Sequence, residues 1–155
     1  MKVLAFVLIL VAGVIAAGIS GASFYVWPTS VGDHKLDVTS AMIEQLSALK
    51  RERKFGPDAA LFYPGAMNEA ERLVAQRAAD GAIQAVIDDL PWHPSRAAVL
   101  GHLKQALAGF PSAESEERER LLFYLSRVLD ICGIASSGEL FNVWRYGFPY
   151  GWFLR

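Results

Sequence analysis

The sequence predicts an all-α protein in which an N-terminal transmembrane or signal helix precedes a compact domain of about five helices. Residues 3–26 contain no charged side chain. After residue 37 the apolar residues recur mainly at spacings of three and four, which places them on one face of a helix. No segment alternates apolar and polar residues as a half-buried strand does. The chain is therefore divided into residues 1–28 (anchor or signal), 29–36 (linker), 37–148 (helical domain) and 149–155 (aromatic tail).

The uncharged leader has two interpretations. As a helix rising about 1.5 Å per residue, it would cross the roughly 30 Å hydrocarbon layer and remain as a membrane anchor. Phe24, Tyr25 and Trp27 would then lie at the membrane interface, which aromatic side chains favour. Alternatively, cleavage near Ala22, after a run of small residues, would release a soluble periplasmic or secreted protein. We favour the anchor, because no break separates the apolar run from the aromatic residues.

The charge before the leader predicts its orientation. Lys2 is the only charged residue that precedes the apolar run. Positive charge beside a membrane helix tends to stay in the cytoplasm, so we expect the domain to face the periplasm from a bacterial inner membrane. No cysteine follows the leader directly, so we expect no lipid-modified N-terminus.

The first domain helix is expected at residues 37–54. Basic side chains gather at its C-terminal turn, between Lys50 and Lys54, where they complement the helix dipole. A phosphate-binding patch is the alternative interpretation of this cluster. Glu52 interrupts the cluster, and a solvated helix end explains it better.

The remaining helices are predicted from their end signals. Asn68 and the glutamate three residues later resemble a capping box, and Ser95 suits an N-cap position. Residues 111–112 (Pro-Ser) begin the most strongly predicted helix, which Gly133 ends. Residues 136–139 (Ser-Ser-Gly-Glu) resemble a second capping box, which begins a short last helix.

Net charge and cysteine content exclude several classes of function. The chain has a formal net charge of −1, and we expect no nucleic-acid partner because no basic surface is predicted. Its one cysteine, Cys132, cannot form an internal disulfide or a cysteine-based metal site. Cys132 lies in an apolar helical stripe, which predicts a buried and unreactive side chain.

Residues suited to catalysis are few. The three histidines, His34, His93 and His102, lack the spacing of a metal site. The adjacent carboxylates Asp88 and Asp89 diverge on a helix. We therefore expect no catalytic residue, no cofactor, no metal and no enzymatic activity. The alternative is a small hydrolase whose polar cleft gathers at least two of Asp88, Asp89, His93 and His102.

The C-terminal segment 144–155 is dominated by aromatic residues. Packed across the helices, its rings would belong to the core; exposed, they would bind a partner or reach the membrane interface. We favour packing as far as residue 148 and leave both interpretations open beyond it. The candidate partner-binding residues are Trp144, Arg145, Tyr146, Phe148, Tyr150, Trp152 and Phe153.

Five motifs are shared with one known family: Phe62-Tyr63-Pro64-Gly65, Glu117-Arg118-Glu119-Arg120, Asp130-Ile131-Cys132-Gly133-Ile134, Ser136-Ser137-Gly138 and Asn142-Val143-Trp144-Arg145-Tyr146-Gly147-Phe148. Over roughly residues 60–148 the chain resembles an uncharacterised bacterial family, the domain of unknown function 4844. The resemblance implies a small helical domain behind a secretion signal and supplies no activity. Two features depart from the family: the leader is long enough to anchor the protein in a membrane, and residues 149–155 extend past the family's usual end.

Together these observations predict a non-enzymatic cell-envelope protein that is attached to a membrane and binds another protein. One version is an accessory subunit of a membrane complex. The alternative version is a periplasmic immunity-type inhibitor of a toxin, and the small hydrolase is the rival from another class.

Overall fold

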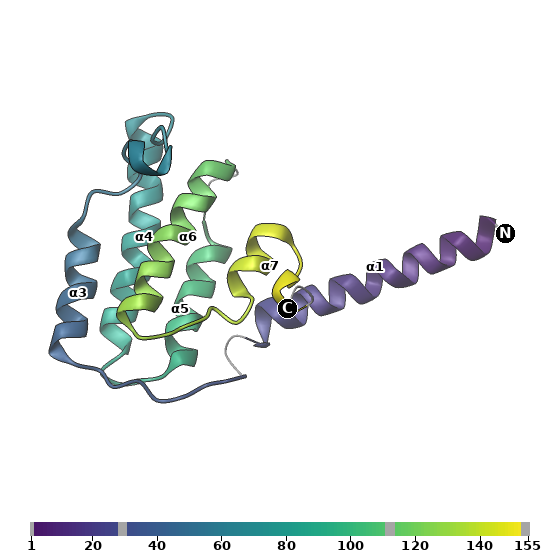
Figure 1. Ribbon diagram of the computed structural model, residues 1–155, viewed down its shortest axis with the longest axis horizontal. Helices are drawn as coiled ribbons and strands as arrows, with labels where there is room; N and C mark the ends of the chain where they lie inside the picture. Colours follow the sequence, from purple (N-terminus) through teal and green to yellow (C-terminus); the bar gives the residue numbers. More distant parts are fainter. Residues whose placement is uncertain (1, 28–30, 111–113, 153–155) are drawn as a thin grey trace.

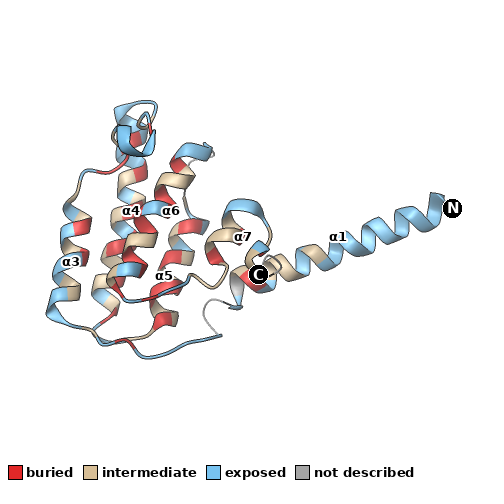
Figure 2. Ribbon diagram, in the orientation of Figure 1, coloured by how far each residue is buried: buried red, intermediate tan, exposed pale blue. Residues whose placement is uncertain are grey.

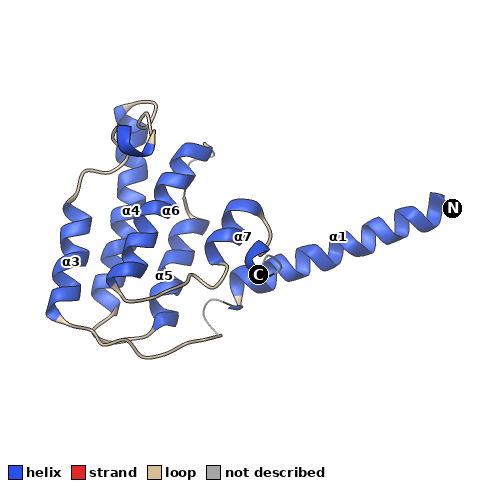
Figure 3. Cartoon of the chain, in the orientation of Figure 1, coloured by secondary structure: helices blue, strands red, loops and turns tan. Residues whose placement is uncertain are grey.

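Helices form every extended element of this protein in the computed structural model, which describes residues 2–27, 31–110 and 114–152 (Figure 1). Within these residues the β-structure is limited to two isolated bridges, and helices are joined by loops alone (Figure 3). The predicted all-α fold is confirmed. Its elements are α1 (Lys2–Tyr25), α3 (Ser40–Arg51), η1 (Ala59–Leu61), α4 (Glu69–Asp89), α5 (Arg96–Ala108), α6 (Ser115–Ile131), α7 (Leu140–Tyr146) and η2 (Tyr150–Trp152).

Helix α4 occupies the centre of the bundle, in contact with α3, α5 and α6 (Figure 1). Its buried positions carry three alanines, Ala75, Ala79 and Ala82, beside Ile83 and Val86. Small side chains let neighbouring helix axes approach closely. One helix can therefore contact three others and hold them around a shared core.

Leucines fill the core between these helices. Each fully buried leucine contributes about 1.5–3 kcal/mol relative to an exposed one, so packing stabilises the domain. The leucines that are at most 1 % exposed are Leu46, Leu49, Leu90, Leu100, Leu103, Leu107, Leu121, Leu125 and Leu140.

Most of the predicted helix ends are confirmed. Asn68 Oδ1 accepts a hydrogen bond from the Glu71 amide at 2.9 Å, and Ser95 Oγ accepts one from the Ala98 amide at 3.1 Å. Gly133 has a φ of 68°, the left-handed conformation that commonly follows a helix. The start predicted for the fourth helix at residues 111–112 lies outside the described residues.

The predicted bounds of the first domain helix are wrong at both ends. The helix spans Ser40–Arg51 instead of residues 37–54. Thr39 caps it, because the Thr39 hydroxyl accepts a hydrogen bond from the Met42 amide at 3.1 Å.

The capping box predicted at residues 136–139 is also wrong. Glu139 has a φ of 72° and is itself the N-cap residue of α7, without a side-chain cap bond. Its carboxylate accepts hydrogen bonds from Asn142 Nδ2 at 2.8 Å and from the Gly151 amide at 2.9 Å. Glu139 therefore fastens the C-terminal tail to the start of α7.

Helix α1 projects from the domain and is exposed along most of its length (Figure 2). Its 24 residues make a helix about 36 Å long. It is long and apolar enough to be a membrane span or a signal sequence. Its last turns differ, because Ser23 is fully buried and Phe24 packs against the core of the domain.

Candidate functional site

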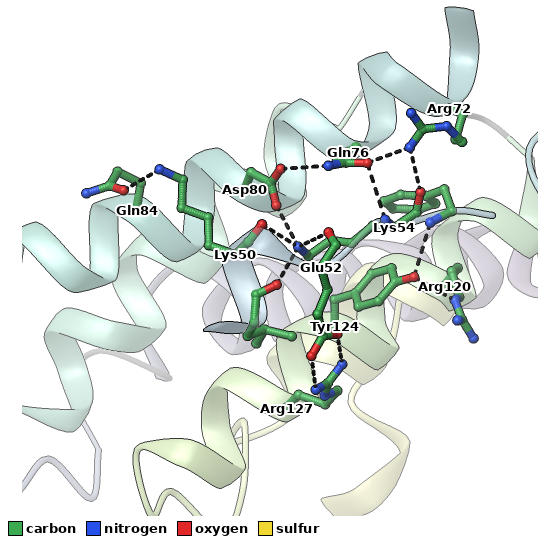
Figure 4. Close-up of polar contacts among 12 residues, drawn as sticks. Lys50, Glu52, Lys54, Arg72, Gln76, Asp80, Gln84, Arg120, Tyr124 and Arg127 are labelled. Atoms are coloured by element: carbon green, nitrogen blue, oxygen red, sulfur yellow. Dashed lines mark hydrogen bonds and ion pairs between the residues drawn. The ribbon is translucent and has the colours of Figure 1, made fainter. Parts of the chain in front are cut away.

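A polar network lies inside the domain where α3 ends (Figure 4). Lys54 is fully buried, and its Nζ lies 2.7 Å from Asp80 Oδ1. The same ammonium donates to the carbonyl oxygens of Leu49, Lys50 and Glu52 at 2.6, 3.0 and 3.1 Å. The carbonyls in the last turn of a helix have no partner within the helix. Lys54 therefore caps α3 and neutralises Asp80 at the same time.

The network continues to α6 through Tyr124. Tyr124 Oη accepts hydrogen bonds from the Phe55 amide at 3.1 Å and from Arg120 Nε at 3.0 Å. Arg120 Nη2 donates to Asp58 Oδ2 at 2.8 Å, which lowers the pKa of Asp58. The network thus fixes the turn between α3 and η1 onto α4 and α6, and we assign it a structural role.

This network overturns the prediction of a solvated helix end at residues 50–54. The helix stops at Arg51, and the chain then turns so that Lys54 lies beneath the helix end. Lys50 is also engaged, because its Nζ donates to Gln84 Oε1 at 2.6 Å. Of the positive charges that the sequence places at the surface, Lys54 is therefore buried in the interior.

The structure brings together three of the four residues named for a hydrolase. His93 Nδ1 lies 2.6 Å from Asp89 Oδ1, and His102 Nε2 lies 2.8 Å from Asp89 Oδ2. Hydrogen bonds from both rings lower the pKa of the Asp89 carboxyl. Asp88 points elsewhere and accepts a hydrogen bond from Gln84 Nε2. The His93 side chain is 72 % exposed, so this cluster lies open to solvent at the C-terminal end of α4.

Neither the third histidine nor the cysteine joins that cluster. His34 is exposed, and its Nδ1 lies 3.1 Å from the Gly32 carbonyl oxygen. Cys132 is buried, as predicted, and burial raises its pKa to about 11. Within residues 2–27, 31–110 and 114–152, no three His, Cys, Asp or Glu side chains are placed to hold a metal.

The end of α1 meets the C-terminal tail in an aromatic junction. The rings of Trp27 and Trp152 are 4.8 Å apart in an edge-to-face arrangement. Ser20 Oγ donates to the Gly147 carbonyl at 2.5 Å, which joins α1 to the end of α7. The junction therefore combines the first and last described parts of the chain. The side chain of Tyr25 and the whole of Phe153 lie outside the described residues.

The tail is packed at its start and more exposed further on. Trp144 Nε1 donates to the Leu107 carbonyl at 2.8 Å, and the Arg118 guanidinium lies 4.4 Å from the Trp144 ring centre. Phe148 is half-buried, whereas Tyr146 and Tyr150 are exposed. The candidate partner-binding residues are thus divided between the core and the surface.

Arg145 forms an ion pair with Glu119 across the surface. Both side chains are about two-fifths exposed, so solvent screens the pair. We therefore assign Arg145 no separate binding role.

A second apolar surface lies at the N-terminal ends of α4 and α6, around the loop that carries η1. Phe62 is 94 % exposed and Met67 is 76 % exposed, which is unusual for large apolar side chains. We call this region the tip surface. It comprises Leu61, Phe62, Met67, Val74 and Phe123, together with Glu71, Glu114, Glu116 and Glu117.

Two grooves hollow the tip surface on either side of the first turns of α6. One has a volume of about 390 Å³ and is lined by Met67, Ala70, Glu71, Val74, Ala75, Glu114 and Glu117. The other has a volume of about 270 Å³ and is lined by Leu61, Phe62, Tyr63, Glu116, Glu119, Arg120 and Phe123. Both grooves place carboxylates beside apolar side chains.

The backbone of the loop holds Phe62 outward. Phe62 has a φ of 51°, which non-glycine residues adopt rarely because of steric strain. Asp58 and Tyr63 on either side exchange two backbone hydrogen bonds, of 2.8 and 2.9 Å, and close the loop. Asp58 Oδ1 also accepts from the Ala60 amide at 3.1 Å. The aromatic ring is therefore displayed by a fixed loop.

Sequence reasoning missed the tip surface. Phe62 lies just before Pro64-Gly65, a pair that favours a turn, and an aromatic residue next to a turn is the available signal. Glu117 gave no separate signal, because a glutamate in the first turn of α6 also suits the helix dipole. Its burial depends on α4, which approaches from a distant part of the sequence.

Comparison with known proteins identifies a family and no activity. The sequence profile of the family described as a domain of unknown function (DUF4844) matches residues 37–149, which is more than half of the chain. No curated protein and no solved structure matches the chain. The chain belongs to the DUF4844 family.

Proposed function

We propose that this protein is a membrane-attached docking subunit, which binds another protein through its tip surface. The observation that carries the proposal is Phe62, an aromatic ring that is 94 % exposed on a strained and closed loop. A ring in this position gains apolar burial only when a partner covers it. Aromatic residues presented in advance in this way are typical of interface hot spots, because little conformational entropy is lost on binding.

Attachment by an uncleaved α1 is the second part of the proposal. It is supported by the continuity of α1 through Ala22, by the burial of Ser23 and by the packing of the partly buried Phe24 against the core. Cleavage near Ala22 would cut inside a continuous helix and remove the hydrogen bond from Ser20 to the Gly147 carbonyl. With Lys2 on the cytoplasmic side, the domain and its tip surface face the periplasm.

The geometry of attachment suits a docking role. The tip surface lies at the N-terminal end of α4, away from the junction of α1 with α7 (Figure 1). A partner on the tip surface can therefore bind without displacing the aromatic junction. The accessory-subunit version requires a fixed partner, and that partner is what the experiment seeks.

The test places a photo-crosslinking amino acid at Phe62 of the full-length protein in living cells. We expect a discrete crosslinked species at this position. Trp92 is the matched control, because it is an exposed aromatic residue at the opposite end of α4. Crosslinking at Phe62 alone, with the partner identified by mass spectrometry, supports the proposal. Equal crosslinking at both positions, or none at Phe62, contradicts it.

A second measurement uses Phe62→Asn, since asparagine tolerates the left-handed backbone. The variant should keep its fold and bind the crosslinked partner about 30-fold or more weakly, as hot-spot losses of roughly 2 kcal/mol imply. Trp92→Ala should bind the partner as the wild type does. Unchanged binding by Phe62→Asn would exclude the tip surface as the docking site.

A further inference from the structure

The larger groove of the tip surface is lined by a buried acidic residue, Glu117. Its two most buried lining residues are Ala75, which is 4 % exposed, and Glu117, which is 8 % exposed. A carboxylate this buried is normally paired or hydrogen-bonded, because removing it from water is costly. Across the described ranges 2–27, 31–110 and 114–152, the Glu117 carboxylate neither forms an ion pair nor accepts a hydrogen bond.

Two arginines that follow Glu117 on α6 are engaged elsewhere. Arg118 lies over the Trp144 ring, and Arg120 forms its ion pair with Asp58. The pKa of Tyr63 is raised to about 12, mainly by burial and secondly by the negative charge of Glu117. Within the described part of the chain, the groove is thus an apolar hollow in which the Glu117 carboxylate has no ion-pair partner.

We propose that this groove receives a lysine or arginine side chain of the partner protein, with the partner's neighbouring apolar residues against Met67 and Val74. The inference rests on the proposed docking function and names the chemistry of the partner. Charge complementarity supports it, because Glu71, Glu114 and Glu117 all line the groove. A metal ion is a poorer occupant, since no three acidic or histidine side chains in the described part of the chain converge to hold one.

A lysine or arginine of the partner would supply the ion pair that Glu117 does not form with the described residues of its own chain. Its N–H groups would donate to the carboxylate in a setting that the groove walls partly desolvate, where such hydrogen bonds are stronger than at an open surface. The aliphatic part of a lysine or arginine side chain would lie along the apolar walls. One residue of the partner would therefore contact both the Glu117 carboxylate and the apolar walls of the groove.

The experiment compares two peptide probes, acetyl-Leu-Lys-Leu-amide and the same peptide with norleucine in place of lysine. The full-length protein is held in nanodiscs of phosphatidylcholine, whose zwitterionic headgroups do not attract the charged peptide. Binding is followed by NMR titration. We expect the wild type to bind the lysine peptide at least tenfold more tightly than the norleucine peptide, in keeping with one charge-assisted hydrogen bond.

The variant Glu117→Gln should abolish this preference by weakening the lysine peptide alone. Glu44→Gln is the matched control, because it removes the same charge from an exposed position on α3, outside the tip surface. It should change the binding of either peptide by less than about twofold, since exposed charges are screened. An equal loss in both variants, a preference retained in Glu117→Gln, or no binding to the wild type overturns the inference.

A stability measurement separates the binding role of Glu117 from a structural one. Glu117 interacts favourably with the N-terminus of α6, so without an internal partner Glu117→Gln should lower the melting temperature by less than about 5 °C. A larger fall would reveal an internal partner and overturn the inference. Crosslinking at Phe62 is independent of both measurements, so the docking function can stand while the assignment of Glu117 fails, or the reverse.

Discussion

At the residue scale, the single side chain of Lys54 both caps the end of α3 and forms an ion pair with Asp80. Its ammonium meets the carbonyls at the end of α3 and the carboxylate of Asp80 within one buried site. An ammonium has three donors and no acceptor, and here all of its capacity is used inside the protein. The sequence places Lys54 in the last turn of a predicted helix, and only the turn beyond Arg51 places it in the interior.

Replacing Lys54 by methionine should destabilise the domain by about 3 kcal/mol or more, because Asp80 and the helix-end carbonyls lose their donor while the volume is kept. Urea unfolding of the full-length protein in detergent measures this change. Lys35→Met is the control, since Lys35 is exposed. It should stay within about 0.5 kcal/mol of the wild type. A loss under about 1 kcal/mol for Lys54→Met would mean that the buried ion pair contributes little.

At the scale of elements, the helix ends divide into those that are capped locally and those that depend on contacts with distant segments. Asn68 and Ser95 cap α4 and α5 through residues three positions away, so their sequence signals were sufficient. Glu139 begins α7 in a left-handed conformation and binds Gly151 of the tail instead of the helix amides. Its role therefore depends on where the tail lies.

Asn68→Ala should lower the stability of the domain by about 1 kcal/mol, because the Glu71 amide loses its acceptor. Asn68→Asp keeps an acceptor oxygen at the same place and should leave stability within a few tenths of a kcal/mol. Thermal unfolding followed by circular dichroism compares the two variants. Equal losses in both would show that the side-chain amide donor to Glu71 matters more than the cap.

At the scale of the whole molecule, α1 and the tail form a single junction. Trp27 follows α1, Trp152 ends η2, and their rings are in contact. If α1 spans a membrane, this contact puts both tryptophans at the level where the helix leaves the bilayer. Indole rings favour that layer because one edge is apolar and the other carries an N–H group.

Single-tryptophan variants of the protein in bilayers test this arrangement. The variant that keeps Trp27 alone should be quenched strongly by lipids brominated near the headgroup end of the chain. The variant that keeps Trp92 alone should be quenched little, because Trp92 lies at the turn between α4 and α5 and is 80 % exposed. Similar quenching of both would place the domain differently on the membrane.

The sequence by itself determined the helical fold, the apolar leader, the burial of Cys132 and the caps at Asn68 and Ser95. These features depend on residues close together in the chain, through helical periodicity, helix ends and hydrophobic burial. Tertiary structure decided the burial of Lys54, the meeting of His93 and His102 at Asp89, and the burial of Glu117 beside α4. Each of these depends on segments far apart in sequence, and no local pattern encodes their approach.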